Sequence, residues 1–179
     1  MSFLDKVVAA VTPPESEEDR AAARHNARQT ATPGDWLSQA LDHHEQIEAA
    51  FEALRRAVPV ARPAAQKQLA TLLTGHSNAE EAVLYPGMAG VGEKGAAGMA
   101  YEEQAMAKVQ MALLETLDPS TQDYDDKLEH IRGAVTHHIY QEESHWLVEL
   151  RGRASEADNA RMTARYAEEI ARYECGMMT

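Results

Sequence analysis

The sequence predicts an all-α fold: an up-down antiparallel four-helix bundle with extra helical segments at its N-terminal and C-terminal ends. The first observation behind this is composition, because aromatic residues make up only 6% of the 179 residues, whereas the good helix formers Ala, Glu, Gln, Leu and Met are common. The second is spacing, since apolar residues recur every three or four positions over long stretches, as one face of a helix requires. The third is the lack of short runs of alternating β-branched residues, the pattern of a strand.

Helix-breaking residues divide the chain into its elements. Asp35 is a suitable N-cap for the first long helix, which should end before Pro59. The second is expected to stop at Tyr85-Pro86, and the glycine-rich stretch 87–98 to form a flexible loop. The connections are short, which favours antiparallel neighbours. The four predicted bundle helices span residues 35–57, 63–84, 98–117 and 121–151.

Further helical segments are predicted outside the bundle. Residues 3–11 and 15–30 have helical patterns, and residues 155–174 should form a helix that packs across the outside of the others. We therefore expect three parts: an N-terminal extension at 1–34, the bundle at 35–151 and a C-terminal helix at 152–179.

The charge and the cysteine usage exclude several classes of protein. The formal net charge of −12 argues against nucleic acid or an anionic membrane as the main partner. Cys175 is the only cysteine, so no intrachain disulfide is possible and a reducing compartment fits. The apolar run near the N-terminus is too short for a signal peptide, and no stretch is long enough for a membrane span. We expect a cytoplasmic protein, and a homodimer is an open alternative to a monomer.

Three of the predicted helices carry polar residues on their apolar faces. These residues follow the helical spacing of three and four. They are His44 in the first helix, His76 and Glu80 in the second, and His138 and Glu142 in the fourth. No Lys or Arg lies on the same stripes, and burying an ionised carboxylate without a counter-charge costs several kcal/mol. We therefore expect a cation in the core.

The spacing and the donor types indicate that this cation is a metal. The histidine and glutamate of each pair are four residues apart, so they project from one side of a helix about 6 Å apart along its axis. Two such pairs on different helices are typical of a dinuclear site in a bundle core. Mixed nitrogen and oxygen donors favour Fe or Mn, allow Zn and disfavour Cu(I).

Four segments of the sequence resemble, in order, those of the hemerythrin-like (HHE cation-binding) family. They are "LDHHEQIEAAF", "GHSNAEEAVLYP", "YEEQAMAKVQMALLETLDP" and "HHIYQEESHW", within roughly residues 35–150. The resemblance implies a four-helix bundle that holds two non-haem iron ions, bridged by carboxylates and by oxo or hydroxo groups, with Mn or Zn as alternative metals. The ligands that it implies are His44, His76, Glu80, His138 and Glu142, with the glutamates as bridges.

The third helix departs from the family pattern. Where the family typically has a histidine in a Y-E-E-H context, this chain has Gln104, a poor iron ligand. The apolar residues of this helix centre its predicted inner face near Glu103 and leave Gln104 at the margin; they are Met99, Met106, Val109, Leu113 and Leu117. Glu103 is therefore a candidate sixth ligand. The alternatives are a solvated Glu103, a Glu103 that contacts a ligand, an open metal position, or a site for one metal.

Residues beside the proposed ligands are weaker candidates. Two carboxylates that follow proposed ligands are expected to face solvent or another helix: Glu81 and Glu143. Other neighbours either approach or orient the site, or belong to the surface or the bundle ends: His43, His137, His145, Tyr85 and Tyr101.

The leading function is a protein that binds or senses O2 or NO at an open iron position, as the resemblance implies. One alternative is a di-iron enzyme, a peroxidase or an NO-reducing or iron-handling oxidase. Another is a structural bundle that holds zinc or no metal. An enzyme would need a proton donor beside the open position, and Glu103 is the strongest candidate in the sequence. The expected partners are therefore small molecules: O2, NO or peroxide.

Overall fold

A computed structural model describes the backbone of residues 15–176 and the side chains of residues 15–173. No strand occurs between residues 15 and 176, and the predicted all-α fold is confirmed. The helix predicted for residues 3–11 and the thiol of Cys175 lie outside the described residues. Within the described part of the chain, no helix combines the length and the apolar character needed to cross a bilayer.

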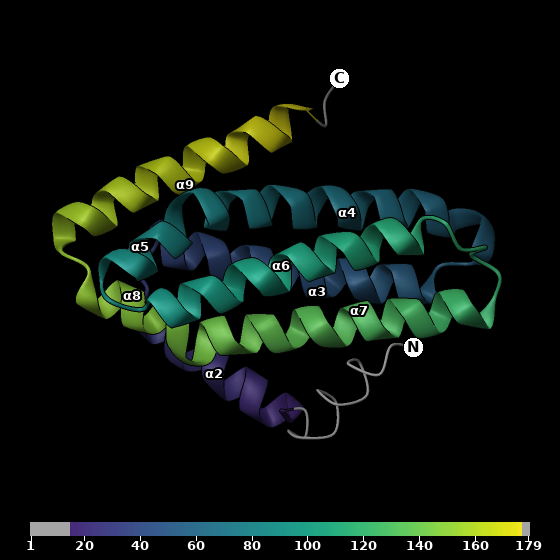
Figure 1. The fold of residues 1–179 in the computed structure, drawn as a ribbon, viewed down its shortest axis with the longest axis horizontal. Helices are drawn as coiled ribbons and strands as arrows, with labels where there is room; N and C mark the ends of the chain where they lie inside the picture. The colour runs from purple at the N-terminus through teal and green to yellow at the C-terminus, as the bar shows by residue number, and fades with distance from the viewer. Residues whose placement is uncertain (1–14, 177–179) are drawn as a thin grey trace.

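Four long helical rods lie side by side and form the bundle (Figure 1). The first and third are single helices, whereas the second and fourth are each interrupted by a π-helical turn. The first rod is α3 (Trp36–Arg56), and a short 3-10 turn, η1 (Pro59–Ala61), leads to the second: α4 (Arg62–Ala79), the π-turn η2 (Glu80–Leu84) and α5 (Tyr85–Gly90). The third rod is α6 (Lys94–Leu114), and the fourth comprises α7 (Gln122–Gln141), the π-turn η3 (Glu142–Trp146) and α8 (Leu147–Arg153).

The apolar core is divided into two clusters along the bundle. One includes Trp36, Leu37, Leu84, Met88, Leu147 and Leu150. The other includes Ile47, Phe51, Leu54, Leu69, Tyr124 and Leu128. The histidines and glutamates predicted as ligands lie where the two clusters meet. His44, for example, follows Leu41 of the first cluster and precedes Ile47 of the second. A buried polar layer therefore separates two apolar layers.

The second rod does not stop at Tyr85-Pro86, and that prediction is wrong. Pro86 lies in the first turn of α5, where the missing N–H is tolerated. The preceding π-turn has a wider backbone spacing, in which the Tyr85 N–H bonds to the Glu80 carbonyl. The glycine-rich stretch is mostly helical too, so the connection to α6 is only residues 91–93, with Gly92 at a φ of 102°.

The inner face of α6 is also not the predicted one. Met99, Met106, Val109 and Leu113 are 46–55% exposed. The residues that face the core are Ala97, Ala100, Gln104, Met111 and Leu114. Two faces of this helix carry apolar residues at helical spacing, and the predicted inner face was the one with more large side chains. Alanines carry little apolar surface, yet they let neighbouring helices approach closely, so they mark the face that is buried.

Two adjacent leucines test this orientation of α6. Leu114→Ala should lower the free energy of unfolding by about 2–5 kcal/mol, because the side chain is fully buried. Leu113→Ala should change it by less than about 0.5 kcal/mol, because Leu113 is half-exposed. Urea denaturation of both variants measures the difference, and equal losses would contradict the orientation.

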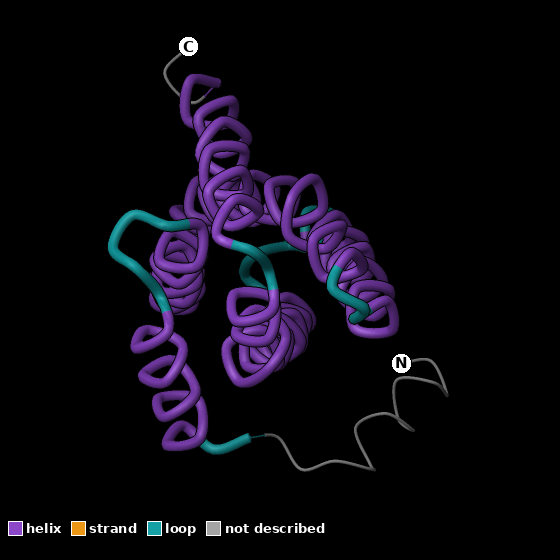
Figure 2. The backbone as a smooth tube through the Cα atoms, turned by 90° about the vertical axis from the view of Figure 1, so that its left-hand side faces the viewer, coloured by secondary structure: helices purple, strands orange, loops and turns teal. Residues whose placement is uncertain are grey.

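Two further helices flank the bundle on opposite sides, α2 (Glu17–Thr30) and α9 (Glu156–Gly176) (Figures 1 and 2). Ser16 caps α2 and forms a capping box with Asp19. Helix α2 packs on α3 and η3, and α9 packs on α4 and α3. Glycine permits the close approach of α9, since a Cβ added at Gly75 would lie 3.1 Å from Tyr173 Cβ. Both terminal segments therefore cover the bundle next to its polar layer.

Candidate metal centre

Four buried side chains from three rods converge in the polar layer. Among the described residues, His44, His76, Glu80 and Glu142 each offer one donor atom, and these atoms lie within 4.8 Å of one another. His44 Nε2 is 3.2 Å from Glu142 Oε2 and 3.7 Å from Glu80 Oε1. His76 Nε2 is 3.2 Å from Glu80 Oε2. The exposed fraction of all four residues is 4% or less, so bulk water does not compensate their charges.

The π-turns begin at the two central glutamates. In the α-helical part before each turn, His76 and Glu80 are four residues apart, and so are His138 and Glu142, which directs each pair to one side. In a π-turn, residues five apart return to the same face, which brings Tyr85 back toward Glu80. The π-turn on the second rod thus adds an aromatic hydroxyl to the group, and π-turns are frequent at functional sites.

Three atoms of the group lack a hydrogen-bond partner within the described residues. They are His44 Nε2, Glu80 Oε1 and Glu142 Oε2, all buried. His44 Nε2 and Glu142 Oε2 lie 3.2 Å apart, and without a metal a proton on this nitrogen would join them. An unpartnered buried polar atom is costly. Two carboxylate oxygens and one imidazole nitrogen that face one another without partners fit a bound cation, which would satisfy all three.

His138 adjoins this group on the side of Tyr85. Its Nε2 lies 3.3 Å from Glu142 Oε1. The Tyr85 hydroxyl lies 3.1 Å from His138 Nε2, 3.0 Å from Glu142 Oε1 and 3.2 Å from Glu80 Oε2. Its single proton is donated to one of these atoms at a time. Gln104 Nε2 donates to Glu80 Oε2 at 2.6 Å. The structure therefore brings five of the six residues predicted as ligands around one small volume.

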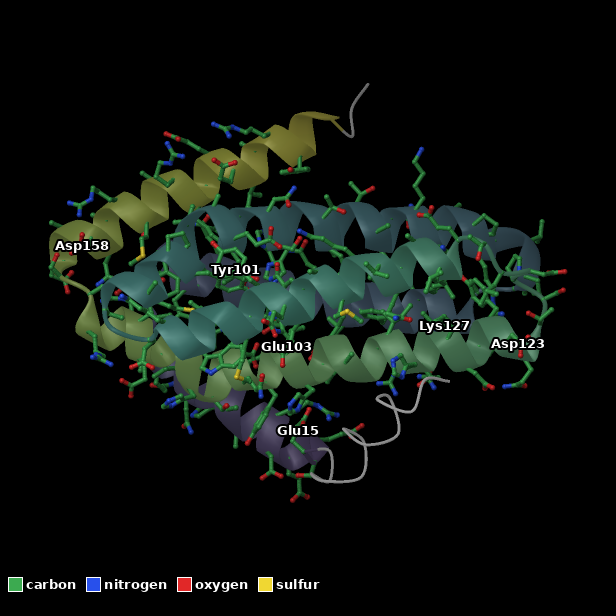
Figure 3. All side chains as sticks on the ribbon, viewed as in Figure 1. Glu15, Tyr101, Glu103, Asp123, Lys127 and Asp158 are labelled. Carbon is green, nitrogen blue, oxygen red and sulfur yellow. The ribbon has the colours of Figure 1, made fainter. Side chains whose placement is uncertain are left out.

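Glu103, the sixth, points elsewhere. Its carboxylate accepts a hydrogen bond from His138 Nδ1 at 2.8 Å, on the far side of the ring from Glu142, and it lies between α6 and α7 (Figure 3). Gln104, which the apolar pattern left at the margin, is 5% exposed and faces the carboxylates. The preference for Glu103 over Gln104 as a ligand rested on the inner face predicted for α6, and that face is wrong. The structure thus corresponds to the alternative in which Glu103 contacts a predicted ligand, His138.

The remaining candidates divide between the site and the surface. Tyr85 is fully buried beside the carboxylates, whereas Tyr101 is 40% exposed and donates to the Glu81 carbonyl. Glu81 accepts from Lys108 Nζ at 2.6 Å at the surface. His145 is exposed, and His137 pairs with Glu15.

Each of the three imidazoles is also held at its other nitrogen. His44 Nδ1 lies 2.9 Å from Glu143 Oε1, and His76 Nδ1 lies 3.3 Å from Tyr166 Oη. Tyr166 is not among the predicted site residues, because the apolar spacing of residues 155–174 explains it as packing. Arg24, which contacts Glu143, is not among them either, because nothing distinguishes this arginine in a charged, alanine-rich segment. Such partners fix ring orientation in metal sites.

The buried carboxylates and imidazoles shift one another's pKa values. Burial raises the pKa of Glu80 to about 7, and the neighbouring charge of Glu142 adds to this. Burial opposes ionisation of Glu142 too, but His138 and His44 lower its pKa well below the usual range. Burial alone would lower the pKa of His138, yet Glu142 and Glu103 raise it to about 10. Against the same effect of burial, Glu142, Glu143 and Glu80 raise the pKa of His44. Protonated imidazoles thus neutralise the carboxylates of the protein chain itself.

The sequence of this chain is similar to those of known proteins. A DNA nickase of Nostoc sp. (strain PCC 7120 / SAG 25.82 / UTEX 2576) is 31% identical over 83 residues, which cover 46% of this chain but only 24% of the nickase. No solved structure matches the chain significantly. The hemerythrin HHE cation binding domain matches residues 37–150, which is more than half of the chain and contains all six residues predicted as ligands. The chain therefore belongs to the hemerythrin family of HHE cation-binding domains.

Proposed function

We propose that this protein binds iron in its polar layer and uses an open iron position to bind or sense O2 or NO. The observation that carries the proposal is the buried group of His44, His76, Glu80 and Glu142, three of whose donor atoms face one another without a hydrogen-bond partner in the described structure. Mixed imidazole and carboxylate donors suit iron or manganese and also accept zinc. His138 would extend the site toward a second ion, since it shares Glu142 with the first group.

Bound iron would supply the affinity for a diatomic molecule. The residues of the chain hold the metal and exclude water from it. Glu80 and Glu142 provide the negative charge that retains the metal, and the imidazoles provide neutral donors. The apolar clusters on both sides of the polar layer exclude water and so restrain oxidation and loss of the metal. The Tyr85 hydroxyl and the Gln104 amide donate hydrogen bonds to the carboxylates.

A binder is favoured over an enzyme by the position of Glu103. This residue was the strongest proton donor that the sequence offered, but its carboxylate contacts the far nitrogen of His138, away from the carboxylates. The DNA-nicking activity of the Nostoc protein is not part of the proposal, because the match covers only 24% of that protein. The charge of −12 also opposes binding to DNA.

The metal content and the absorption spectrum of freshly purified protein test the proposal. We expect up to two irons per chain, ligand-to-iron charge-transfer bands, and a reversible spectral change under O2 or NO. A colourless protein with zinc would indicate a structural bundle instead. Turnover of hydrogen peroxide by the iron-loaded protein would favour the enzyme.

Metal binding should release protons, and its affinity should rise with pH. The pKa of His138 is raised to about 10 and that of His44 well above its usual value. In the absence of metal, both rings are therefore imidazolium cations at pH 7, with a proton on each nitrogen. A metal that takes these nitrogens must displace about two protons per chain. Below pH 7 proton competition increases further, so affinity falls. Indicator dye in weakly buffered solution measures the release on addition of Mn2+ or Fe2+, and binding without release would contradict the prediction.

A further inference from the structure

We infer that the two terminal helices hold two imidazoles of the metal centre in place. Helix α9 positions His76 through Tyr166, and α2 positions His44 through Arg24 and Glu143. Neither Tyr166 nor Arg24 lies in the stretch that matches the family, residues 37–150. The inference rests on the proposed metal binding and adds to it: the unit that holds the metal extends from α2 to α9.

Tyr166 determines which nitrogen of His76 is free. The Tyr166 hydroxyl is fully buried and lies 3.3 Å from His76 Nδ1 and 3.2 Å from His43 Nδ1. A neutral imidazole that binds a metal through Nε2 carries its proton on Nδ1. His76 would then donate this proton to the Tyr166 oxygen, and Tyr166 would donate its own to His43. This directed chain of hydrogen bonds aims His76 Nε2 at Glu80, from which it is 3.2 Å away.

Helix α9 is anchored on both sides of Tyr166. Asn159 and Tyr173 are seven residues before and after it, so all three lie on the same face of the helix. Asn159 Oδ1 accepts a hydrogen bond from Trp36 Nε1 on α3 at 3.0 Å. Tyr173 contacts Asn78 on α4 through its hydroxyl and packs over a glycine of the same helix. The face of α9 that holds the bundle at both ends therefore places Tyr166 at the site.

Helix α2 acts on His44 through a carboxylate. Glu143 is 1% exposed, and its Oε1 lies 2.9 Å from His44 Nδ1. A buried carboxylate needs a cation, and Arg24 provides it by donating from Nε to both oxygens at 2.9 and 3.1 Å. The guanidinium is itself held by Glu48, with distances of 2.7 and 3.0 Å. Without Arg24, Glu143 would lose its counter-charge and with it a fixed position for the His44 ring.

Two conservative variants with matched controls test the inference in the full chain. Tyr166→Phe removes one hydroxyl and keeps the ring. Its control is Tyr124→Phe. Tyr124 is a buried tyrosine of the other apolar cluster, and its hydroxyl donates to Gln66. Arg24→Gln removes the cation beside Glu143. The control Arg28→Gln removes an arginine of the same helix that pairs with Asp42 and Glu45 and donates to the Ser38 carbonyl, away from the polar layer.

The measured quantity is the dissociation constant for iron, from competition with a chelator. Tyr166→Phe and Arg24→Gln should each bind iron about 10–100-fold more weakly than the wild type, the usual effect of losing a partner of a metal ligand. Tyr124→Phe and Arg28→Gln should bind as tightly as the wild type, even where they melt at a lower temperature. Wild-type affinity in both site variants, or equal losses in the controls, would overturn the inference.

A second measurement on metal-free protein separates this inference from the proposed function. Nitrogen-15 spectra of the histidine rings report which nitrogen of His76 carries the proton and whether it is hydrogen-bonded. We expect a single tautomer with the proton on Nδ1, lost in Tyr166→Phe and kept in Tyr124→Phe. If the wild type bound no iron, the proposed function would fail, while this change of tautomer would still support the positioning by α9. Identical ring spectra in all three proteins would overturn it.

Discussion

Glu142→Gln should abolish iron retention. The substitution keeps the size of the side chain but removes the negative charge of the residue that joins the two halves of the site: Glu142 Oε2 faces His44 Nε2 and Glu142 Oε1 faces His138 Nε2. Loss of the carboxylate should therefore weaken iron binding by more than the roughly 10–100-fold expected for a residue that only orients a ligand. The iron content after dialysis against a chelator measures this.

The control for this variant is Glu129→Gln. Glu129 is on the same rod, but its side chain is 42% exposed and pairs with Arg55 and Arg132 at the surface. It should retain iron like the wild type, because exposed ion pairs contribute little. Full iron content in Glu142→Gln would contradict the assignment of the metal site to the polar layer.

Iron loading should raise the melting temperature by about 10 °C. A metal that binds only the folded chain stabilises it by about 4 kcal/mol when the free metal concentration is 1,000 times the dissociation constant. For a chain of 150–250 residues, each kcal/mol corresponds to about 2–4 °C. The effect should be large here because the four donors come from three rods and converge only in the folded chain, so the free energy of metal binding adds to the free energy of folding.

Differential scanning calorimetry of the iron-loaded and chelator-treated protein measures the shift. Glu142→Gln, which should hold no iron, provides the control, and its melting temperature should not respond to added iron. An equal rise in this variant would show that iron stabilises the protein at some other place. No rise in the wild type would count against a preformed site.

The sequence identified the site on three rods because their apolar stripes are rich in large side chains. In α3, α4 and α7 the leucine, isoleucine, valine and phenylalanine residues define one face clearly, so a histidine or glutamate in line with them stands out. On α6 the same reasoning failed. Its inner face combines Ala97 and Ala100 with Met111 and Leu114, whereas Met99, Met106 and Leu113, which are equally apolar, are exposed. The spacing of apolar residues shows which faces of a helix are apolar, but it does not show which of two apolar faces packs against the other helices.

Helix interruptions could not be predicted from local sequence. Pro86 normally ends a helix, and here it follows a π-turn that begins at Glu80 and lets the rod continue. The turn that begins at Glu142 has no proline near it and left no sign in the sequence. Both turns start in the polar layer, where Glu80 and Glu142 also contact His44 of another rod.

By itself, the sequence determined the helical class, the four main segments and the five histidines and glutamates that meet in the core, because helical spacing and residue type are local properties. Only the tertiary structure decided that Gln104 rather than Glu103 faces the carboxylates and that Tyr85 lies among them. It also decided that Tyr166 contacts His76 and that Arg24 contacts Glu143, the partner of His44. Those contacts join residues up to about 120 positions apart, such as Arg24 and Glu143. They depend on how whole helices pack, which no local pattern encodes.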